Sequence, residues 1–206
     1  MLLSESNHQA IQTVVESVYA KAKQIPGLIL TEGDLKCHLF LELAKSPEFS
    51  SPVQTQENHI LATPLHTEVS WFDKDEKLTI KPDITILSPE HLSIIYERHT
   101  CKLPPRKQFS FDGQAFIFEL KFIRSWSGFT SSKLDEVKKD FQKIKSLFDR
   151  LHGIRAANDT FCYFIVFSRY RCTNPDWNNF FRENDKHEHW RCIYRSLDVP
   201  LPEYET

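Results

Sequence analysis

The chain has 206 residues, of which 40% are apolar and 26% are charged, and its formal net charge is −2. This length and composition are typical of one globular domain, and they exclude a largely disordered or fibrous chain. The charge is unevenly distributed, since residues 1–97 hold 7 basic and 14 acidic side chains while residues 98–206 hold 19 basic and 14 acidic ones. A basic half suits a polyanionic partner, although solvated surface charge is the commoner explanation of any single cluster.

The first predicted element is a helix over residues 6–23, where apolar residues recur at helical spacing until the Pro-Gly pair at 26–27. A second helix follows to about residue 45, with Thr31 as the expected N-cap and Asp34 as its capping-box partner. At about 100° per residue, Glu32 falls within the apolar stripe of this helix. Glu32 is therefore either a first-turn carboxylate favoured by the helix dipole or a side chain directed towards the sheet and a cation.

Residues 46–63 show little periodicity, which predicts a loop. Residues 65–72 and 78–87 alternate between apolar and polar side chains, so we expect a hairpin of two strands about a polar turn. The connection over residues 88–113 is long for a compact domain, which indicates an insertion with a function or structure of its own. Within it, residues 94–96 have the composition of a short helix or strand.

A central strand is predicted over residues 115–123, because the segment is apolar on both faces. An amphipathic helix follows, with Ser132 as its expected N-cap and Asp135 as the capping-box partner. Residues 160–168 predict a fully buried strand, so strand, helix and strand form a βαβ unit with parallel strands. Two shorter elements complete the chain: an aromatic helix near residues 176–183 and a strand or helix near residues 190–194.

The main functional signal is the presence of ionisable residues inside apolar strands. Asp83 follows a proline in one strand, and Glu119 and Lys121 lie two residues apart in the central strand. Burying an unpaired charge is costly, so such charges are usually paired or bind a metal. Because alternate residues of a strand point to one face, Glu119 and Lys121 project side by side, and Asp83 on an adjacent strand can reach the same place.

A D/E-x-K triplet alone is a weak signal, and the chain contains four of them: Asp34-Leu35-Lys36, Asp75-Glu76-Lys77, Glu119-Leu120-Lys121 and Glu136-Val137-Lys138. Only the triplet at 119–121 lies in an apolar strand, follows a Pro-Asp strand and precedes a helix and a second strand. With this combination, the chain over about residues 32–168 resembles the PD-(D/E)xK nuclease superfamily, which has the restriction-endonuclease-like fold.

The resemblance implies an α/β fold with a central mixed β-sheet of four or more strands flanked by helices. It implies a single nuclease-like domain over residues 1–206, with its core at about 31–168. The remaining parts are an N-terminal helix within residues 1–26, the insertion loop at 88–113 and a C-terminal extension over 169–206.

The resemblance also implies a metal-dependent endonuclease that hydrolyses phosphodiester bonds of DNA, in preference to RNA, with Mg²⁺ or Mn²⁺ as its cofactor. Asp83, Glu119 and the carbonyl of Leu120 would bind the metal through the hard oxygen atoms that Mg²⁺ prefers. The metal would polarise the phosphate and activate a water molecule. Lys121 would hold or help deprotonate that water and stabilise the transition state. Glu32 would complete the catalytic and metal-binding set.

Two alternatives to the nuclease remain open. One is an internal salt bridge of Lys121 with Asp83 or Glu119. The other is a catalytically inactive module on the same fold that binds nucleic acid or protein. A homodimer or a subunit of a larger complex is compatible with any of these functions. The candidate contacts with nucleic acid are Arg98, Lys102, Arg106, Lys107, Arg124 and Lys138, each of which is otherwise a solvated surface charge.

Further expectations concern cysteine, zinc and cellular location. The five cysteines are odd in number and form no CxxC pair, which predicts free thiols in a reducing compartment. No basic, apolar leader opens the sequence and no apolar run is long enough to cross a bilayer, so we expect a cytoplasmic protein without a membrane partner. Glu68 is a weaker candidate neighbour of the metal. The weaker candidates for zinc are Cys172, His187, His189 and Cys192.

Overall fold

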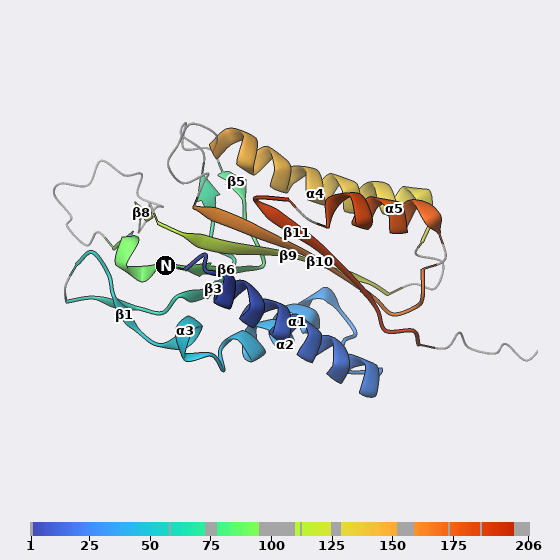
Figure 1. Ribbon diagram of the computed structural model, residues 1–206, viewed down its shortest axis with the longest axis horizontal. Coiled ribbons are helices and arrows are strands. Elements are labelled where there is room, and N and C mark those ends of the chain that lie inside the picture. Colours follow the sequence, from blue (N-terminus) through green and yellow to red (C-terminus); the bar gives the residue numbers. More distant parts are fainter. Residues whose placement is uncertain are drawn as a thin grey trace, which may run out of the picture.

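A five-stranded mixed sheet forms the centre of the protein (Figure 1). The computed structural model describes residues 2–57, 59–72, 78–94, 110–111, 113–124, 129–151, 159–172, 174–185 and 187–199. The strand order is β11-β10-β9-β6-β3. These strands are β3 (Leu65–Thr67), β6 (Ile84–Leu87), β9 (Ala115–Ile123), β10 (Thr160–Ser168) and β11 (Trp190–Ser196). Strands β9, β10 and β11 run parallel, whereas β6 is antiparallel to both β9 and β3.

Helices cover both faces of the sheet (Figure 1). One face carries α1 (Glu5–Gln24) and α2 (Glu32–Leu43), and the other carries α4 (Ser131–Leu151) and α5 (Pro175–Asn184). The expectation of an α/β fold with a mixed sheet flanked by helices is therefore confirmed. The first helix and the last strand that the structure describes both contribute to this fold, because α1 packs on the sheet and β11 is one of its strands.

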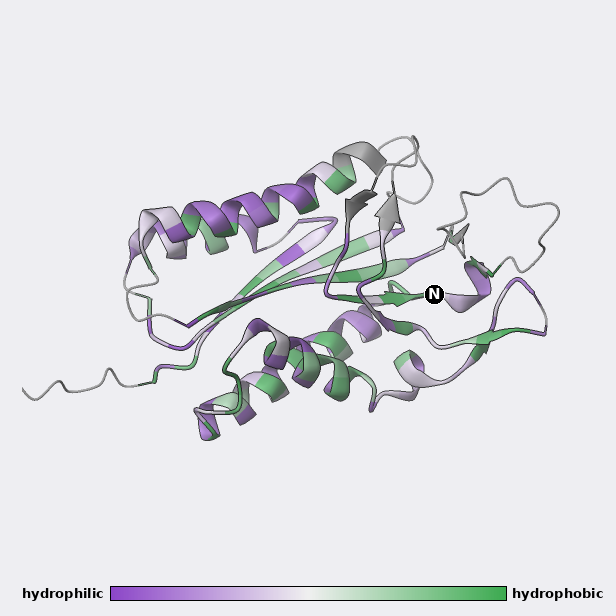
Figure 2. Cartoon of the chain, turned by 180° about the vertical axis from the view of Figure 1, so that it is seen from behind, coloured by the Kyte–Doolittle hydropathy of each residue, from purple (hydrophilic) through white to green (hydrophobic). Residues whose placement is uncertain are grey.

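Side chains of β9 alternate between two apolar layers. Phe116, Phe118 and Leu120 pack into the layer formed with α1 and α2, whereas Ile117 and Ile123 pack into the layer formed with α4 and α5. Successive strand residues point to opposite faces, so Glu119 and Lys121 belong to the α4 side. Figure 2 shows the hydrophobic strands between the helices and the hydrophilic outer side of α4.

The helices and the parallel strands follow the predictions closely. Strands β9 and β10 begin and end at the predicted residues, and they are adjacent and parallel, as a βαβ unit requires. Thr31 is the N-cap of α2, where its hydroxyl accepts the N–H of Asp34 (3.1 Å) and the carboxylate of Asp34 accepts the N–H of Thr31 (2.9 Å). The segment near 190–194, predicted as a strand or a helix, is strand β11.

Three local predictions were wrong. The segment 46–63 is not only a loop, because it contains α3 (Pro47–Ser50) and the paired strands β1 (Val53–Gln54) and β2 (Leu61–Ala62). The cap of α4 is not Ser132, because the hydroxyl of Thr130 accepts the N–H of Lys133 (3.2 Å). The predicted hairpin has two parts, in which β3 pairs with β6 while β4 (Trp71–Phe72) pairs with β5 (Leu78–Ile80).

The interruption of this hairpin has a local cause in each strand. Glu68 adopts a left-handed backbone with φ of 55°, which ends β3. Pro82 lies between β5 and β6 and has no N–H to donate to a ladder. As a result, β4 and β5 leave the main sheet, and β5 contacts α4 (Figure 1).

The described part of the 88–113 connection is fixed by strand pairing and by hydrogen bonds to Glu57. It contains a 3₁₀ turn, Pro89–His91, and the strand β7 (Leu92–Ser93), which pairs with β8 (Ser110–Phe111). The carboxylate of Glu57 accepts the hydroxyl of Ser93 (2.6 Å) and the N–H of Ile94 (3.0 Å). A Cβ atom on Gly113 would lie 2.4 Å from His91, so glycine permits this close approach.

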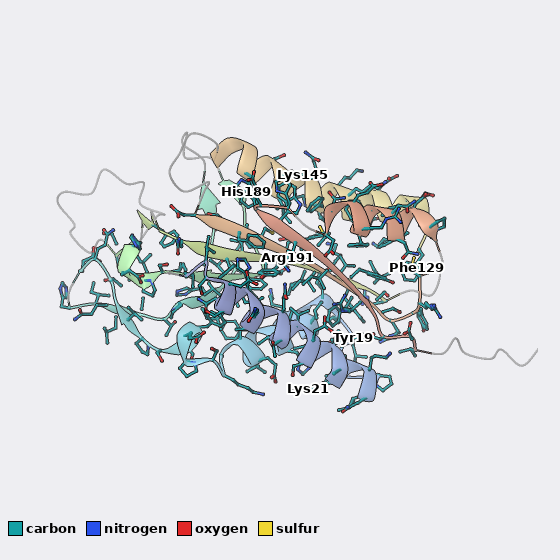
Figure 3. The ribbon with its side chains drawn as sticks, in the orientation of Figure 1. Tyr19, Lys21, Phe129, Lys145, His189 and Arg191 are labelled. Carbon is teal, nitrogen blue, oxygen red and sulfur yellow. The ribbon has the colours of Figure 1, made fainter. Side chains whose placement is uncertain are left out.

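Contacts of α1 tie the N-terminal segment to the sheet and to α2. Tyr19 and Lys21 lie on α1 (Figure 3). The hydroxyl of Tyr19 donates to the carbonyl of Ser196 in β11 (3.0 Å), and Lys21 pairs with Glu42 on α2 (2.5 Å). The four described cysteines, Cys37, Cys162, Cys172 and Cys192, are free. Within the described ranges, no helix combines the length and the apolar character that a membrane span needs.

Candidate active site

The candidate site lies where β6 stops pairing with β9. Their ladder extends from Leu87 opposite Ala115 to Ile84 opposite Phe118, while β9 continues to Ile123. Asp83 covers the next part of the β9 edge, because its N–H donates to the carbonyl of Phe118 (3.0 Å) and its Oδ2 accepts the N–H of Leu120 (3.0 Å). The Pro-Asp sequence therefore ends a strand and leaves a carboxylate at the edge of its neighbour.

Glu119 is a partly buried carboxyl group of the site. Burial raises its pKa to about 8, and the negative charges of Asp83 and Asp140 add to this effect. The positive charges of Lys121 and Lys143 oppose it but do not cancel it. A carboxyl group in such surroundings is protonated at neutral pH unless a cation stabilises its ionised form.

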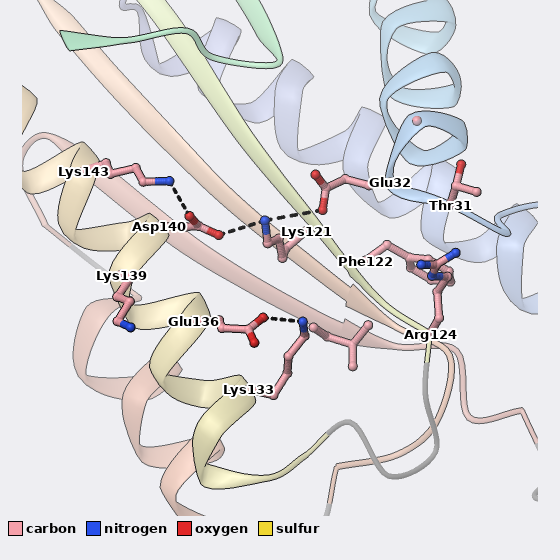
Figure 4. A pocket seen from close by; sticks show the side chains of 12 residues that line it. Thr31, Glu32, Lys121, Phe122, Arg124, Lys133, Glu136, Lys139, Asp140 and Lys143 are labelled. Carbon is pink, nitrogen blue, oxygen red and sulfur yellow. Dashed lines mark hydrogen bonds and ion pairs between the residues drawn. The ribbon is translucent and has the colours of Figure 1, made fainter.

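Lys121 lies between a carboxylate of α4 and a carboxylate of α2 (Figure 4). Its Nζ is 2.8 Å from Asp140 Oδ2 and 3.7 Å from Glu32 Oε2. Burial alone would lower the pKa of Lys121, but the hydrogen bond to Asp140 and the charge of Glu32 outweigh burial, and the pKa is raised. Lys121 is therefore a fixed ammonium group. Its ion-pair partners are Asp140 and Glu32, and not Asp83 or Glu119, the partners in the internal salt bridge that the sequence left open as an alternative.

A second lysine lies beside Asp83. Lys36 Nζ is 3.6 Å from Asp83 Oδ1 and 2.9 Å from Glu68 Oε1. Glu68 also pairs with Lys81 (2.7 Å), and its hydrogen bonds with Lys81 and Lys36 lower its pKa to about 2. Glu68 is thus paired with two lysines, one of which also lies beside Asp83.

A cleft of ≈ 650 Å³ opens beside Lys121, between the first turn of α2, the end of β9 and the N-terminal half of α4 (Figure 4). The cleft is lined by Thr31, Glu32, Gly33, Lys121, Phe122, Ile123, Arg124, Lys133, Glu136, Lys139, Asp140 and Lys143. Five of these residues are basic and three are acidic. The candidate site therefore adjoins a cleft with an excess of positive charge.

The structure separates the predicted site residues into groups. Asp83 and Glu119 are electrostatic neighbours, with Lys121 two residues along the same strand face. Glu32 reaches the site through Lys121. Of the candidate contacts with nucleic acid, Arg124 lines the cleft and Lys138 does not. Outside the described residues lie Arg98, Lys102, Arg106 and Lys107.

Two residues of the site were missed in the sequence. Asp140 lies three residues after Val137 and four before Ile144, both of which are buried, so helical spacing places it beside the apolar stripe of α4. That position is the signal that could have identified it. Lys36 belongs to a D/E-x-K triplet that was set aside because it lies on a helix. It is four residues after Glu32 and three before the buried Leu39, so the same helical spacing could have identified it.

The donor atoms at the β9 edge suit a hard divalent cation. In a strand, the N–H and C=O of one residue point to the same edge, so the carbonyl of Leu120 projects towards Asp83, as its N–H does. Two carboxylates and one carbonyl, completed by water, are a donor set that Mg²⁺ accepts. Among the described residues no three His, Cys, Asp or Glu side chains form a metal-binding group. Glu32 is thus not grouped with Asp83 and Glu119, and the four candidate zinc ligands are not grouped with one another.

Comparisons of the chain with models of protein families, with curated proteins and with solved structures found no match. Inferences about function therefore depend on the geometry and chemistry of the side chains described above.

Proposed function

We propose that the protein is a metal-dependent nuclease that hydrolyses phosphodiester bonds of DNA on a restriction-endonuclease-like fold. One observation carries the proposal. A partly buried carboxyl group with a raised pKa, Glu119, adjoins the carboxylate of Asp83 at an open strand edge. On the same face of β9, the fixed ammonium group of Lys121 lines a basic cleft. Such perturbed groups beside a cleft are typical of catalytic sites.

Asp83, Glu119 and the carbonyl of Leu120 are the groups that would hold Mg²⁺ or Mn²⁺. A cation held there would supply positive charge for a phosphate oxygen and would lower the pKa of a water molecule. Lys121 donates hydrogen bonds to the phosphate and stabilises the negative charge that develops on it, because Asp140 fixes its Nζ (2.8 Å). Glu32 has an exposed carboxylate next to this ammonium group, so its Oε2 can orient the attacking water and accept a proton.

A second candidate function is binding of nucleic acid without cleavage. It is favoured by the pairing of the site charges, since Lys121 pairs with Asp140 and Lys36 lies near Asp83. An ion network in which each charge has a partner can be structural. In that case the fold and the basic cleft serve binding alone.

Cleavage assays with defined variants test the proposal. Single-stranded and duplex DNA and RNA are incubated with the protein in Mg²⁺, Mn²⁺ or EDTA, and products are separated on denaturing gels. We expect metal-dependent cleavage of DNA that falls at least about 100-fold in Asp83→Asn and Lys121→Met. The matched control is Lys138→Met, which removes an exposed charge of α4 outside the cleft and should retain activity.

The metal site is tested separately by thermal unfolding. Mg²⁺ or Mn²⁺ should raise the Tm of the wild type more than that of Asp83→Asn, because a ligand that binds the native state stabilises it. Cleavage that persists in both site variants would refute the assignment. Binding of DNA without cleavage at any metal concentration would favour the second candidate function.

A further inference from the structure

The basic residues of the cleft differ in whether a carboxylate already neutralises them. Lys121 and Lys143 both contact Asp140, at 2.8 and 2.7 Å. Lys133 pairs with Glu136 one turn along α4. The positive charges of these three lysines are partly neutralised within the protein. They therefore attract a polyanion less strongly than three unpaired lysines would.

Arg124 and Lys139 are the other two basic residues of the cleft. Both are exposed, and neither has an ion pair with a carboxylate in the part of the chain that the structure describes. Figure 4 shows the contrast, because dashed lines join Lys121, Lys133 and Lys143 to carboxylates while none reaches Arg124 or Lys139. The excess positive charge of the cleft therefore resides on these two side chains.

The two residues come from different walls of the cleft. Arg124 directly follows β9, three residues after Lys121, and Lys139 lies on α4 next to Asp140, which holds Lys121. A chain of phosphates lying in the cleft could contact cations on two of its walls. Guanidinium and ammonium groups in such positions bind phosphate oxygens and carry no base readout by themselves.

We infer that the cleft between α2 and α4 is a backbone-binding subsite for nucleic acid, in which Arg124 and Lys139 contact the phosphates next to the cleaved bond. The inference rests on the proposed function for the position of that bond, but binding itself does not need cleavage. The subsite contributes affinity independently of base sequence. Lys138 is excluded from it, although it adjoins Lys139 and carries the same charge, because it does not line the cleft.

Fluorescence anisotropy in EDTA tests the inference without the catalytic metal. Labelled single-stranded and duplex DNA of several sequences are titrated with wild type, Lys139→Ala, Arg124→Ala and the matched control Lys138→Ala over a range of salt concentrations. Loss of one phosphate contact should weaken binding by about three- to tenfold for every sequence and lower the salt slope by about one. The Lys138→Ala protein should bind within about twofold of the wild type.

The comparison of Lys138 with Lys139 decides the inference. Equal losses in Lys138→Ala and Lys139→Ala, or a loss confined to one DNA sequence, would overturn it. Lys139→Ala should weaken the binding of one form of DNA, single-stranded or duplex, more than the other. The form whose affinity falls more is the one that enters the cleft. All three substitutions are at exposed positions, and circular dichroism confirms that each variant folds.

Failure of this inference and failure of the proposed function are distinguishable. One outcome is that the wild type binds DNA, that Lys139→Ala reduces the salt slope of this binding, and that no cleavage is observed. In that case the subsite is supported and the nuclease proposal fails. If the wild type cleaves DNA while Arg124→Ala and Lys139→Ala retain its KM and its salt slope, the subsite fails and the nuclease proposal stands.

Discussion

Replacement of Glu119 by glutamine should change how the stability of the protein depends on pH. Burial, with smaller contributions from the charges of Asp83 and Asp140, raises the pKa of Glu119 from 4.5 to about 8. Glutamine has nearly the same shape as the protonated glutamate but cannot ionise. The Glu119→Gln protein therefore keeps the packing of β9 and loses only the titration.

The expected magnitude follows from the linkage between proton binding and folding. Between pH 4.5 and about 8 the folded protein binds a proton at Glu119 that the unfolded chain has released. The free energy of unfolding must therefore fall as the pH rises, by about 1.4 kcal/mol per pH unit, and level off above the folded pKa. From pH 5 to pH 7 the wild type should lose about 3 kcal/mol relative to Glu119→Gln.

Urea unfolding measures this difference directly. Wild type, Glu119→Gln and the control Glu183→Gln, which removes an exposed carboxyl group of α5, are unfolded in EDTA at pH values from about 5 to 8.5. The control should follow the wild type. If the difference between wild type and Glu119→Gln stays within about 0.5 kcal/mol over this range, then Glu119 is ionised in the folded protein and the reasoning from burial is refuted.

Two further predictions concern α2. Lys36→Met removes the cation that lies 3.6 Å from Asp83 Oδ1, so Mn²⁺ affinity measured by calorimetry should rise about three- to tenfold. Lys81→Met, which removes the other partner of Glu68, is the control, and equal effects of the two substitutions would contradict the prediction. Thr31→Ala removes the N-cap of α2 and should lower the free energy of unfolding by about 1 kcal/mol, whereas Thr31→Ser should lose less than half of that. A stability of Thr31→Ala equal to that of the wild type in urea would show that the cap is dispensable.

The longest apolar segments were the most predictable from sequence. Strands β9 and β10 begin and end at the expected residues, because each is a mainly apolar segment of nine residues that suits a buried sheet position. The cap of α2 was predictable as well, because a capping box fixes two residue types at a set spacing. The charged residues of β9 were identified as a candidate site on the same grounds, since apolar strands rarely tolerate them.

The parts that sequence did not predict depend on small energy differences or on side-chain direction. Thr130 and Ser132 both carry a hydroxyl suited to a helix cap, and only the start of α4 distinguishes them. Lys138 and Lys139 are adjacent lysines of one amphipathic helix, and about 100° of helical rotation decides which one lines the cleft. The hairpin is interrupted at Glu68, whose left-handed backbone costs free energy for a residue other than glycine. The side chain of Glu68 forms ion pairs with two lysines that are distant in sequence, and sequence patterns do not reveal such partners.

The hydrogen bond from Leu120 to Asp83 also has a consequence for solubility. Beyond Phe118, β9 continues without its ladder partner β6. An unpaired strand edge can form hydrogen bonds with a strand of another chain. The carboxylate of Asp83 occupies the Leu120 N–H (3.0 Å) and places a charge at that edge. Asp83→Ala would therefore favour self-association during folding as well as removing a proposed metal ligand. Asp83→Asn retains an oxygen acceptor for the same N–H, so it separates loss of chemistry from exposure of the edge.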